Sequence, residues 1–299
     1  MIQSKTQNGY PINIPTMFNK YKYIKQLGCG STCAVFKVED QFSHVKFSAK
    51  ILPKKDIEER NLMESIINEV NILRSIDHSN IIKVYDAFEM KNEYEEEYLV
   101  IIMEYCSKGN LLNYARNHGF KTDGEKKKII EGFLEAIQYL HEYKISHGDI
   151  KLENILLDES YSPKLCDFGY SRVNQIAGDE SKNGTLFYAA PELFIKGQFD
   201  TLKTDIYAIG ITLYTLSELQ LPFKMGNKKS IVNQILSGHL SFKKGIDRHL
   251  TKLIEKCTSR NPQNRPTISD IINDEYFTCE KNNQENILST LKFKLQPQH

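Results

Sequence analysis

Cysteine, long apolar runs and an excess of charge of one sign are all scarce in this sequence. Six cysteines in 299 residues are too few for a disulfide framework, which favours a reducing compartment. The longest apolar segment, Ile206 to Leu216, is interrupted and too short to cross a bilayer, and the N-terminus lacks the pattern of a signal peptide. We therefore expect a cytoplasmic or nuclear protein with no membrane partner.

Neither sign of charge dominates, because Lys and Arg together number 39 and Asp and Glu together number 38. A global basic field that would draw the protein to nucleic acid is thereby excluded, and we expect a monomer with no nucleic-acid partner. The apolar share of 40% and charged share of 26% are those of a soluble globular chain, which can bury the core of one large domain or two packed lobes.

The apolar pattern divides the chain into a strand-rich first part and a helix-rich remainder. Alternating runs predict strands at Tyr21 to Leu27, Ala34 to Val38, Phe47 to Leu52, Ile82 to Phe88 and Tyr98 to Met103, with one helix among them. Strands followed by helices, without β-α-β alternation, predict an α+β fold with two segregated lobes. Residues 1–20 are predicted to form a loosely held N-terminal arm, and residues 279–299 a tail.

Two helices of the second part have clear sequence signals. Thr122 and Glu125 have the spacing of a capping box and precede apolar residues at helical intervals, which predicts a helix to about Glu142. The segment Ile206 to Leu219 is apolar almost all round, which predicts a helix buried on every side.

A glycine-bearing turn, with Gly28 and Gly30, lies between two predicted strands. Glycine lets backbone amides approach phosphate oxygens closely, but the same residues also suit an ordinary hairpin, so both interpretations stay open at this point. A dinucleotide site of the Rossmann type is disfavoured because the required helix does not follow.

A lysine and a glutamate occupy positions where an unpaired charge would be costly. Lys50 lies within the apolar strand Phe47 to Leu52, and Glu69 falls within the apolar stripe of the helix Leu62 to Ile76. A carboxylate on an apolar face is expensive to bury unless it is paired. The two side chains are therefore candidates for an ion pair, although these positions alone also fit two residues that never meet.

Polar residues interrupt apolar runs in the segment from His147 to Gly169. Asp149, Asn154 and Asp167 supply oxygen ligands or a base there, and Lys151 supplies a point charge. Hard oxygen donors of this kind suit Mg²⁺, which uses few carboxylates together with substrate phosphates.

The order of these motifs resembles that of the eukaryotic protein kinase family over residues 21 to 278. The resemblance implies a bilobal kinase fold, with an antiparallel-sheet N-lobe (21–104) that contains one key helix and a mainly helical C-lobe (105–278). It also implies a serine/threonine protein kinase that uses ATP and Mg²⁺ and acts on protein substrates with Ser or Thr acceptors.

The resemblance implies a role for each residue of the phosphate and metal sites. Lys50 would hold the α- and β-phosphates and would be oriented by Glu69. Asp149 would accept the hydroxyl proton of the substrate, and Lys151 would steady the transferring γ-phosphoryl group. The predicted metal ligands are Asn154 and Asp167.

The nucleotide pocket follows from the same resemblance. The predicted contacts are Leu27, Gly28, Gly30, Val35, Ala49, Lys50, Met103, Glu104, Cys106, Asn110 and Leu156. Among them, Val35, Ala49 and Leu156 would sandwich the adenine ring. Met103 would lie at the back of the pocket and Asn110 near the ribose.

Later motifs of the family imply supporting contacts and the class of acceptor. Thr185 would contact Asp149 and Lys151, as in serine/threonine kinases. By resemblance, a buried salt bridge would join Glu192 to Arg265, and Asp205 would brace the catalytic loop. The residues of these motifs are most similar to those of the calcium/calmodulin-dependent and SNF1-related branch.

Two positions depart from the family pattern. Cys33 replaces the third glycine of the loop, and Gly148 replaces the arginine that usually precedes the catalytic aspartate. The second change removes the cation that normally pairs with a phosphorylated activation loop. We therefore hypothesise that basal activity depends little on phosphorylation of Ser181, which occupies the usual phosphosite position.

The cysteines give a second hypothesis. By resemblance Cys29, Cys33, Cys106 and Cys166 lie on or near the nucleotide pocket, which predicts that thiol reagents inactivate the enzyme and that ATP protects it. The alternative is that these thiols are buried and inert.

The main alternative function is a pseudokinase, a scaffold that binds partners without catalysis. Its usual mark is loss of the lysine or of either aspartate, and Lys50, Asp149 and Asp167 are all present. A small-molecule kinase fits less well, because the segment Thr185 to Glu192 resembles the docking surface for peptide substrates.

Overall fold

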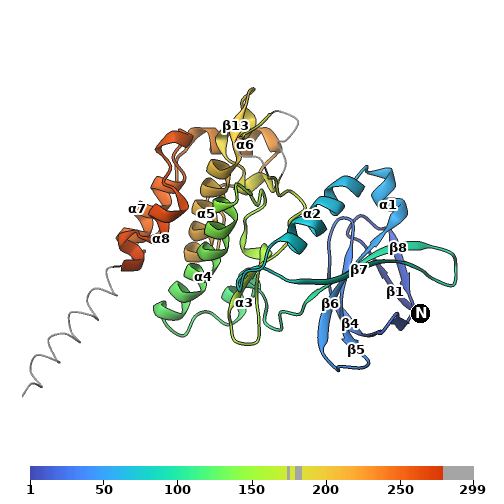
Figure 1. Ribbon diagram of the computed structural model, residues 1–299. Helices are drawn as coiled ribbons and strands as arrows, with labels where there is room; N and C mark the ends of the chain where they lie inside the picture. Colours follow the sequence, from blue (N-terminus) through green and yellow to red (C-terminus); the bar gives the residue numbers. More distant parts are fainter. Residues whose placement is uncertain (174–175, 179–183, 279–299) are drawn as a thin grey trace, which may run out of the picture. The chain divides into compact units, whose positions relative to one another are not determined.

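The computed structural model describes residues 1–173, 176–178 and 184–278 (Figure 1). Within this range the chain forms two compact units. The first contains residues 1–109 and 155–171, and the second contains residues 110–154 and the chain from residue 172 onward. Ser181 and the predicted tail lie outside the described residues.

The first unit is built on a six-stranded antiparallel sheet with the strand order β3-β4-β5-β6-β8-β7. The strands of this unit are β1 (Ile2–Lys5), β2 (Pro11–Ile14), β3 (Met17–Phe18), β4 (Tyr21–Cys29), β5 (Ala34–Asp40), β6 (Lys46–Pro53), β7 (Val84–Lys91), β8 (Glu97–Glu104), β10 (Ile155–Leu157) and β11 (Pro163–Leu165). The predicted strands at 21–27, 34–38, 47–52 and 98–103 fall on strands of this sheet, and the one at 82–88 overlaps β7, which begins two residues later, at Val84.

Alternation along the strands gives the sheet two apolar faces. In β6, Ala49 and Ile51 belong to one buried cluster, whereas Leu52 belongs to another. Because successive side chains of a strand point to opposite faces, Lys50 lies on the face of Leu52. The second face packs against α2 (Met63–Ser75), whose Ile66 is in the same cluster as Leu52.

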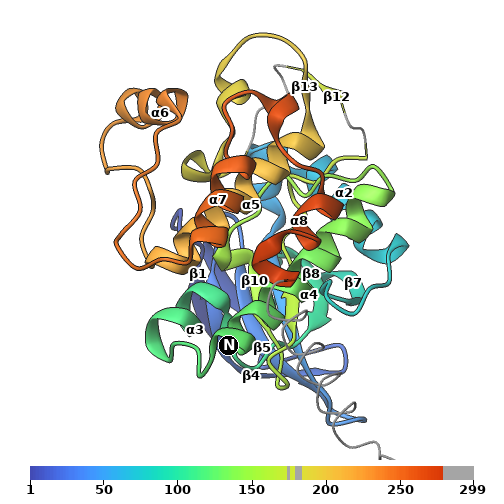
Figure 2. The ribbon, with the colours of Figure 1, turned by 90° about the vertical axis from the view of Figure 1, so that its left-hand side faces the viewer.

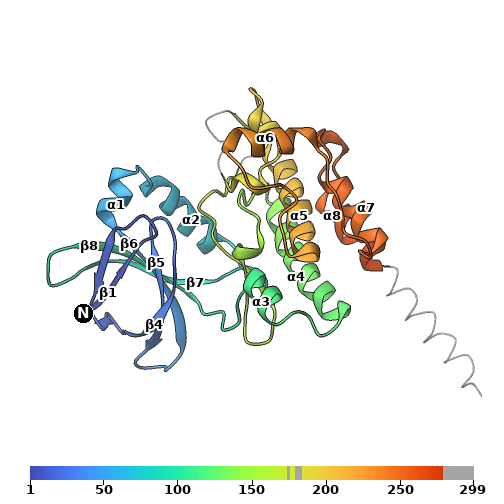
Figure 3. The same cartoon turned by 180° about the vertical axis from the view of Figure 1, so that it is seen from behind.

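The N-terminal arm is not loosely held, contrary to our expectation. Strands β1 and β2 pair as an antiparallel hairpin, and β3 joins the edge of the large sheet. Figure 3 shows β1 beside the strands of the large sheet. Ile12 and Ile14 of β2 are fully buried in the cluster that contains Ala49. Burial of these apolar side chains outweighs the local preference of a polar, proline-containing segment for irregular structure.

Two helices follow β6, where the sequence predicted one. A short helix, α1 (Lys54–Glu59), precedes α2 and buries Ile57 against the sheet. Glu69 of α2 is buried, as its place in the apolar stripe required.

The second unit is mainly helical. Its helices are α3 (Leu111–Asn117), α4 (Asp123–Glu142), α5 (Thr201–Glu218), α6 (Lys228–Ser237), α7 (Arg248–Cys257) and α8 (Ile268–Ile272), with short 3₁₀ helices η1 (Leu152–Asn154), η3 (Leu186–Tyr188), η4 (Pro191–Phe194) and η5 (Pro262–Asn264). A small pair of strands, β12 (Ile176–Ala177) and β13 (Phe199–Asp200), completes it, and β9 (Gly109–Asn110) lies where the chain passes from the first unit to the second.

Both helices predicted in this part are present. Thr122 caps α4 by accepting a hydrogen bond from the backbone N–H of Glu125, and the helix ends at Glu142 as predicted. The carboxylate of Glu125 accepts from the N–H of Lys121, so the reciprocal half of the capping box is shifted by one residue. Helix α5 is buried along nearly its whole length.

Close packing around α5 depends on a glycine. Figure 2 shows α7 beside α5 and α8 beside α4, in agreement with the contacts between these elements. A Cβ on Gly210 of α5 would lie 2.6 Å from Thr258 and 2.8 Å from Cys257, which is too close for any side chain. The glycine therefore allows α7 to pack directly on the backbone of α5.

Candidate active site

The glycine-rich loop (residues 28–33) joins β4 to β5 in the first unit. Gly28 pairs with Val35 across the two strands, and the backbone N–H of Gly30 donates to the carbonyl of Cys33 at 2.8 Å. A Cβ on Gly30 would lie 3.2 Å from the Cys33 sulfur, so cysteine at the third position crowds the second. Leu27, at the start of the loop, is exposed.

The predicted ion pair between strand and helix is present. The Lys50 amine donates to both carboxylate oxygens of Glu69, at 2.8 and 2.9 Å. The carboxylate of Asp167 lies 3.8 Å from the same amine, and its side chain is 47% exposed. Burial alone would lower the pKa of Lys50, but the carboxylates of Glu69 and Asp167 raise it above its ordinary value. The lysine is therefore held as a cation.

Helix α2 also holds the segment that contains Asp167. The Ser65 hydroxyl donates to the carbonyl of Gly169 at 2.6 Å, and the Asn68 amide donates to the carbonyl of Ser171 at 3.0 Å. Asp167 itself has a φ of 66°, a backbone conformation that is strained for a residue with a side chain. Strain of this kind is common at functional sites.

The face of β6 that carries Lys50 contradicts one predicted contact. Ala49 is fully buried in the cluster that contains Ile12 and Ile14, and this cluster lies on the opposite face of the sheet from Lys50. Ser48, two residues before Lys50, shares its face and pairs with Met103 of β8. Ser48 and not Ala49 thus lies on the face of β6 that carries Lys50.

The end of β8 carries the other predicted contacts of the first unit. Met103 packs in the cluster on the Lys50 face, and Cys106 is buried just beyond the strand. The carboxylate of Glu104 accepts from the Lys164 amine of β11 at 2.8 Å. Leu156, on the neighbouring β10, pairs with Lys164, which places it beside this strand end.

A second cluster, in the other unit, surrounds Asp149. The Lys151 amine lies 2.5 Å from one carboxylate oxygen, and the Thr185 hydroxyl donates to the other at 2.7 Å. Lys151 also donates to the Thr185 hydroxyl at 2.8 Å, which closes a triangle of contacts. Burial raises the pKa of Asp149, but the charge and hydrogen bond of Lys151 and the bond from Thr185 outweigh it and lower the pKa below its ordinary value. Asp149 is therefore an ionised acceptor at neutral pH.

Asp205 of α5 holds the backbone of the loop that carries Asp149. The buried carboxylate of Asp205 accepts from the backbone N–H of His147 at 2.8 Å and of Gly148 at 2.9 Å. Its Oδ2 also lies 3.0 Å from the His141 ring. The bracing predicted for Asp205 is thus present.

Two glycines meet beside the Asp149 cluster. Gly148 has a φ of 79°, and a Cβ on Gly184 would lie 2.7 Å from the Gly148 carbonyl oxygen. Gly184 has a φ of 107°, so a side chain there would be both strained and in collision. The close approach brings Thr185, the next residue, to Asp149.

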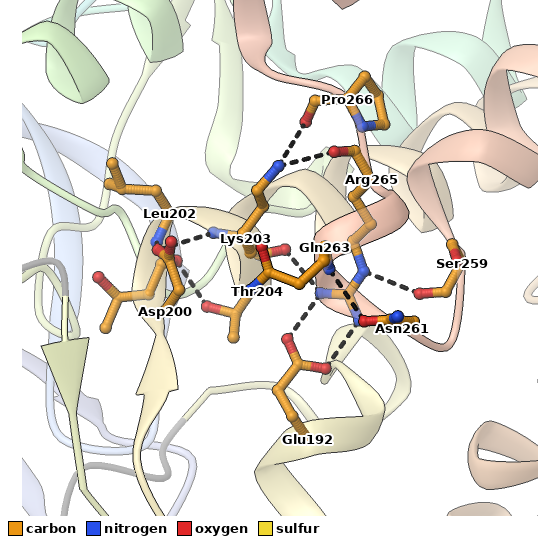
Figure 4. A network of polar contacts seen from close by, with 11 residues as sticks. Glu192, Asp200, Leu202, Lys203, Thr204, Ser259, Asn261, Gln263, Arg265 and Pro266 are labelled. Carbon is orange, nitrogen blue, oxygen red and sulfur yellow. Dashed lines mark hydrogen bonds and ion pairs between the residues drawn. The ribbon is translucent and has the colours of Figure 1, made fainter.

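The predicted bridge between Glu192 and Arg265 is also present (Figure 4). The guanidinium donates to both carboxylate oxygens, at 2.6 and 2.7 Å, in the bidentate geometry typical of strong pairs. It also donates to the backbone carbonyls of Ser259 and Lys203. The Arg265 side chain is fully buried, and these contacts use all three of its guanidinium nitrogens.

The donors fit a hard divalent cation bound together with phosphates. Both hydrogen bonds of Asn154 to Asp149 are donated by its amide nitrogen, which turns its oxygen away from that carboxylate. Among the described residues no cluster of three or more His, Cys, Asp or Glu side chains could hold a metal alone. A carboxylate oxygen, from Asp167, and an amide oxygen, from Asn154, are donors that a hard divalent cation accepts beside waters and phosphate oxygens.

The structure thus brings the predicted residues together in two groups. Lys50, Glu69 and Asp167 meet in the first unit, and Asp149, Lys151, Asn154 and Thr185 meet in the second. Asn110 caps α3 through a bond from the N–H of Asn113, and its contact with a ribose stays a prediction.

Comparison with known proteins agrees with this arrangement. A family model described as a protein kinase domain matches residues 21–277. "Serine/threonine-protein kinase PLK1" of Xenopus tropicalis is 29% identical over 266 residues, which are 88% of this chain and 44% of the relative. "Sucrose non-fermenting protein kinase 1" of Fusarium virguliforme is 31% identical over 262 residues, which are 87% of this chain and 36% of the relative.

The chain spans less than half the length of these relatives. These two relatives are almost equally identical to the chain, so its branch within the kinase family stays a prediction. In the described part of the chain, none of the helices has the length and apolar character needed to span a membrane.

Proposed function

The chain belongs to the protein kinase family, and from this we propose that it transfers the γ-phosphoryl group of ATP to Ser or Thr hydroxyls of protein substrates. The observation that carries the proposal is the Asp149 cluster. A pseudokinase would have no need for an ionised, buried carboxylate held in place by Lys151 and Thr185.

The residues of the first unit serve the nucleotide. Bound Mg-ATP supplies the electrophilic γ-phosphorus and its leaving group. Lys50, fixed by Glu69, offers a cation for phosphate oxygens, and the backbone of the glycine-rich loop offers N–H donors. Asp167 offers a carboxylate for the metal.

The residues of the second unit serve the acceptor. Asp149 orients the acceptor hydroxyl and receives its proton, and Lys151 neutralises charge as the phosphoryl group moves. Asn154 contributes its amide oxygen to the metal. The Thr185 hydroxyl bridges Asp149 and Lys151, the arrangement that the family resemblance associates with Ser or Thr acceptors.

The test is the rate of peptide phosphorylation by Asp149→Asn. The variant keeps the shape of the side chain but loses the base, and turnover should fall on the order of 10² to 10⁴. Asp77→Asn is the matched control, because the Asp77 side chain is 88% exposed. Equal turnover of Asp149→Asn and wild type would contradict the proposal.

We further propose that Mg²⁺ is the resident metal and that the protein acts as a cytoplasmic monomer without nucleic acid. Titration with Mg²⁺ after chelation should restore activity, whereas Ca²⁺, which prefers more oxygen ligands at longer distances, should restore little. Light scattering of the purified chain tests the monomer, and imaging of a fluorescent fusion tests the compartment.

A further inference from the structure

The turn of the N-terminal hairpin (residues 2–14) contacts the glycine-rich loop directly. The backbone N–H of Gln7 donates to the Gly30 carbonyl at 2.8 Å, and its side-chain amide donates to the Cys29 carbonyl at 2.9 Å. The Asn8 amide donates to the Ser31 carbonyl at 2.7 Å. Three successive carbonyls of the loop are therefore held by two adjacent residues of the hairpin.

These bonds fix the direction of the N–H groups in the loop. A trans peptide is planar, so the N–H that follows each carbonyl points the opposite way. Because the Gly30 and Ser31 carbonyls face the hairpin, the N–H groups of Ser31 and Thr32 face away from it. The hairpin packs on one face of the sheet and Lys50 projects from the other, so these donors lie on the side of Lys50.

The hairpin is itself firmly attached to the sheet. Ile12 and Ile14 are fully buried in the core. Between them, the N–H of Asn13 donates to the Tyr98 hydroxyl at 3.0 Å, and the Asn13 carbonyl accepts from the Asn92 amide at 2.9 Å. A hairpin attached in this way can hold the glycine-rich loop in a fixed position relative to the sheet.

A further attachment joins the same turn to α1. The Tyr10 hydroxyl bonds to the carboxylate of Glu59, and the Arg60 guanidinium lies 5.9 Å from the Tyr10 ring centre. Arg60 in turn pairs at 2.5 Å with Asp56, which is fully buried in α1. The turn thus links the glycine-rich loop to the helix that leads into α2.

We propose that Gln7 and Asn8 are positioning residues for the nucleotide phosphates. They hold the glycine-rich loop so that the N–H groups of Ser31 and Thr32 are oriented for phosphate oxygens before the nucleotide binds. The proposal rests on the proposed function only in that the ligand is a nucleotide. It predicts an effect on ligands with phosphates that is absent for ligands without them.

The experiment measures binding of ADP and of adenosine by calorimetry to the full chain, with Gln7→Ala/Asn8→Ala as the variant. The control is Gln3→Ala/Lys5→Ala, which truncates two exposed side chains of the same hairpin on the opposite face of β1 from Ser4, whose hydroxyl contacts Gln26 of β4. The Kd for ADP should rise about three- to tenfold in the variant, as expected for loss of two exposed hydrogen bonds, and the Kd for adenosine should stay within twofold. The KM for ATP should rise by the same factor with little change in kcat.

Two outcomes would overturn the proposal: a Kd for ADP within twofold of wild type, or an equal weakening of ADP and adenosine. The control variant should match wild type for both ligands, and an equal loss there would also overturn it. If the double variant is unfolded, as judged by its circular dichroism, Asn8→Ala alone gives the same comparison. Because binding needs no turnover, a wild-type protein that binds ADP but phosphorylates no peptide would defeat the proposed function and leave this test intact.

Discussion

Replacement of Arg265 by lysine should destabilise the protein although the positive charge is kept. The guanidinium makes four hydrogen bonds, two to Glu192 and one each to the carbonyls of Ser259 and Lys203, at 2.6 to 2.9 Å. A lysine amine is a single atom and cannot reach three groups that the planar fork of arginine spans. At least one charge-assisted bond is lost, and the partly buried carbonyl of Ser259 can lose its donor.

The cost follows from the burial of the pair. Loss of one hydrogen bond to a charged group costs about 1.5–3 kcal/mol, and an unsatisfied, partly buried carbonyl adds to it, so we expect about 2–4 kcal/mol for Arg265→Lys. Complete removal of the cation by Arg265→Ala should cost about 3–5 kcal/mol, because it leaves the Glu192 carboxylate, 13% exposed, without its partner. For a chain of this size the lysine variant should lower Tm by roughly 3–6 °C.

Thermal unfolding followed by circular dichroism measures this directly. Arg248→Lys is the matched control, since Arg248 is exposed at the start of α7 and should shift Tm by about 1 °C or less. A double-mutant cycle with Glu192→Gln should give a coupling energy of about 1 kcal/mol or more. A Tm for Arg265→Lys equal to that of the control would refute the reasoning.

Three further predictions concern the site. Glu69→Gln removes the carboxylate partner of Lys50 and should cost about 3 kcal/mol of stability. This is the lower end of the range for a broken buried pair, because the Asp167 carboxylate lies 3.8 Å from the same amine. A denaturant midpoint unchanged from wild type would contradict this prediction. Burial raises the pKa of Cys106 to about 12, so at pH 7.5 it is protonated and unreactive, and peptide mapping should find alkylation at the exposed Cys29 before Cys106. Ser181→Ala should keep at least a tenth of wild-type activity in a peptide assay, and a larger loss would show that activation needs this residue.

The elements with strong local signals were predictable from the sequence. Period-two alternation located the strands of the large sheet, and the capping residue Thr122 located the start of α4. For these elements residue type and position were enough, because the constraint was local. Helical spacing placed Glu69 on a buried face, which made it a candidate for an ion pair, but its pairing with Lys50 followed only from the resemblance to the kinase family.

The N-terminal hairpin was not predictable in this way. Only Ile12 and Ile14 alternate there, within a short segment that contains proline, and such a hairpin is stable only when it packs on a larger sheet. The bonds from Gln7 and Asn8 to the glycine-rich loop depend on that packing and have no sequence signal. The placement of Ala49 beside Lys50 was wrong for a different reason: alternate residues of a strand share a face, so Ser48 and not Ala49 lies on the face of Lys50.

The backbone of the catalytic loop was only partly predictable. The positive φ of Gly148 and the contact that a Cβ on Gly184 would make with its carbonyl are tertiary features. Gly148 was recognised from the sequence only as the loss of an arginine. Its structural role is to let two segments approach until Thr185 reaches Asp149.

The most direct test of the account is a peptide-array assay with the purified protein, Mg²⁺ and ATP labelled at the γ-phosphate, followed by phosphoamino-acid analysis. We predict label on serine and threonine, and its loss in a parallel preparation of Asp149→Asn. Label on neither residue with the wild-type protein, or equal label with both preparations, would contradict the assignment of this chain as an active serine/threonine kinase.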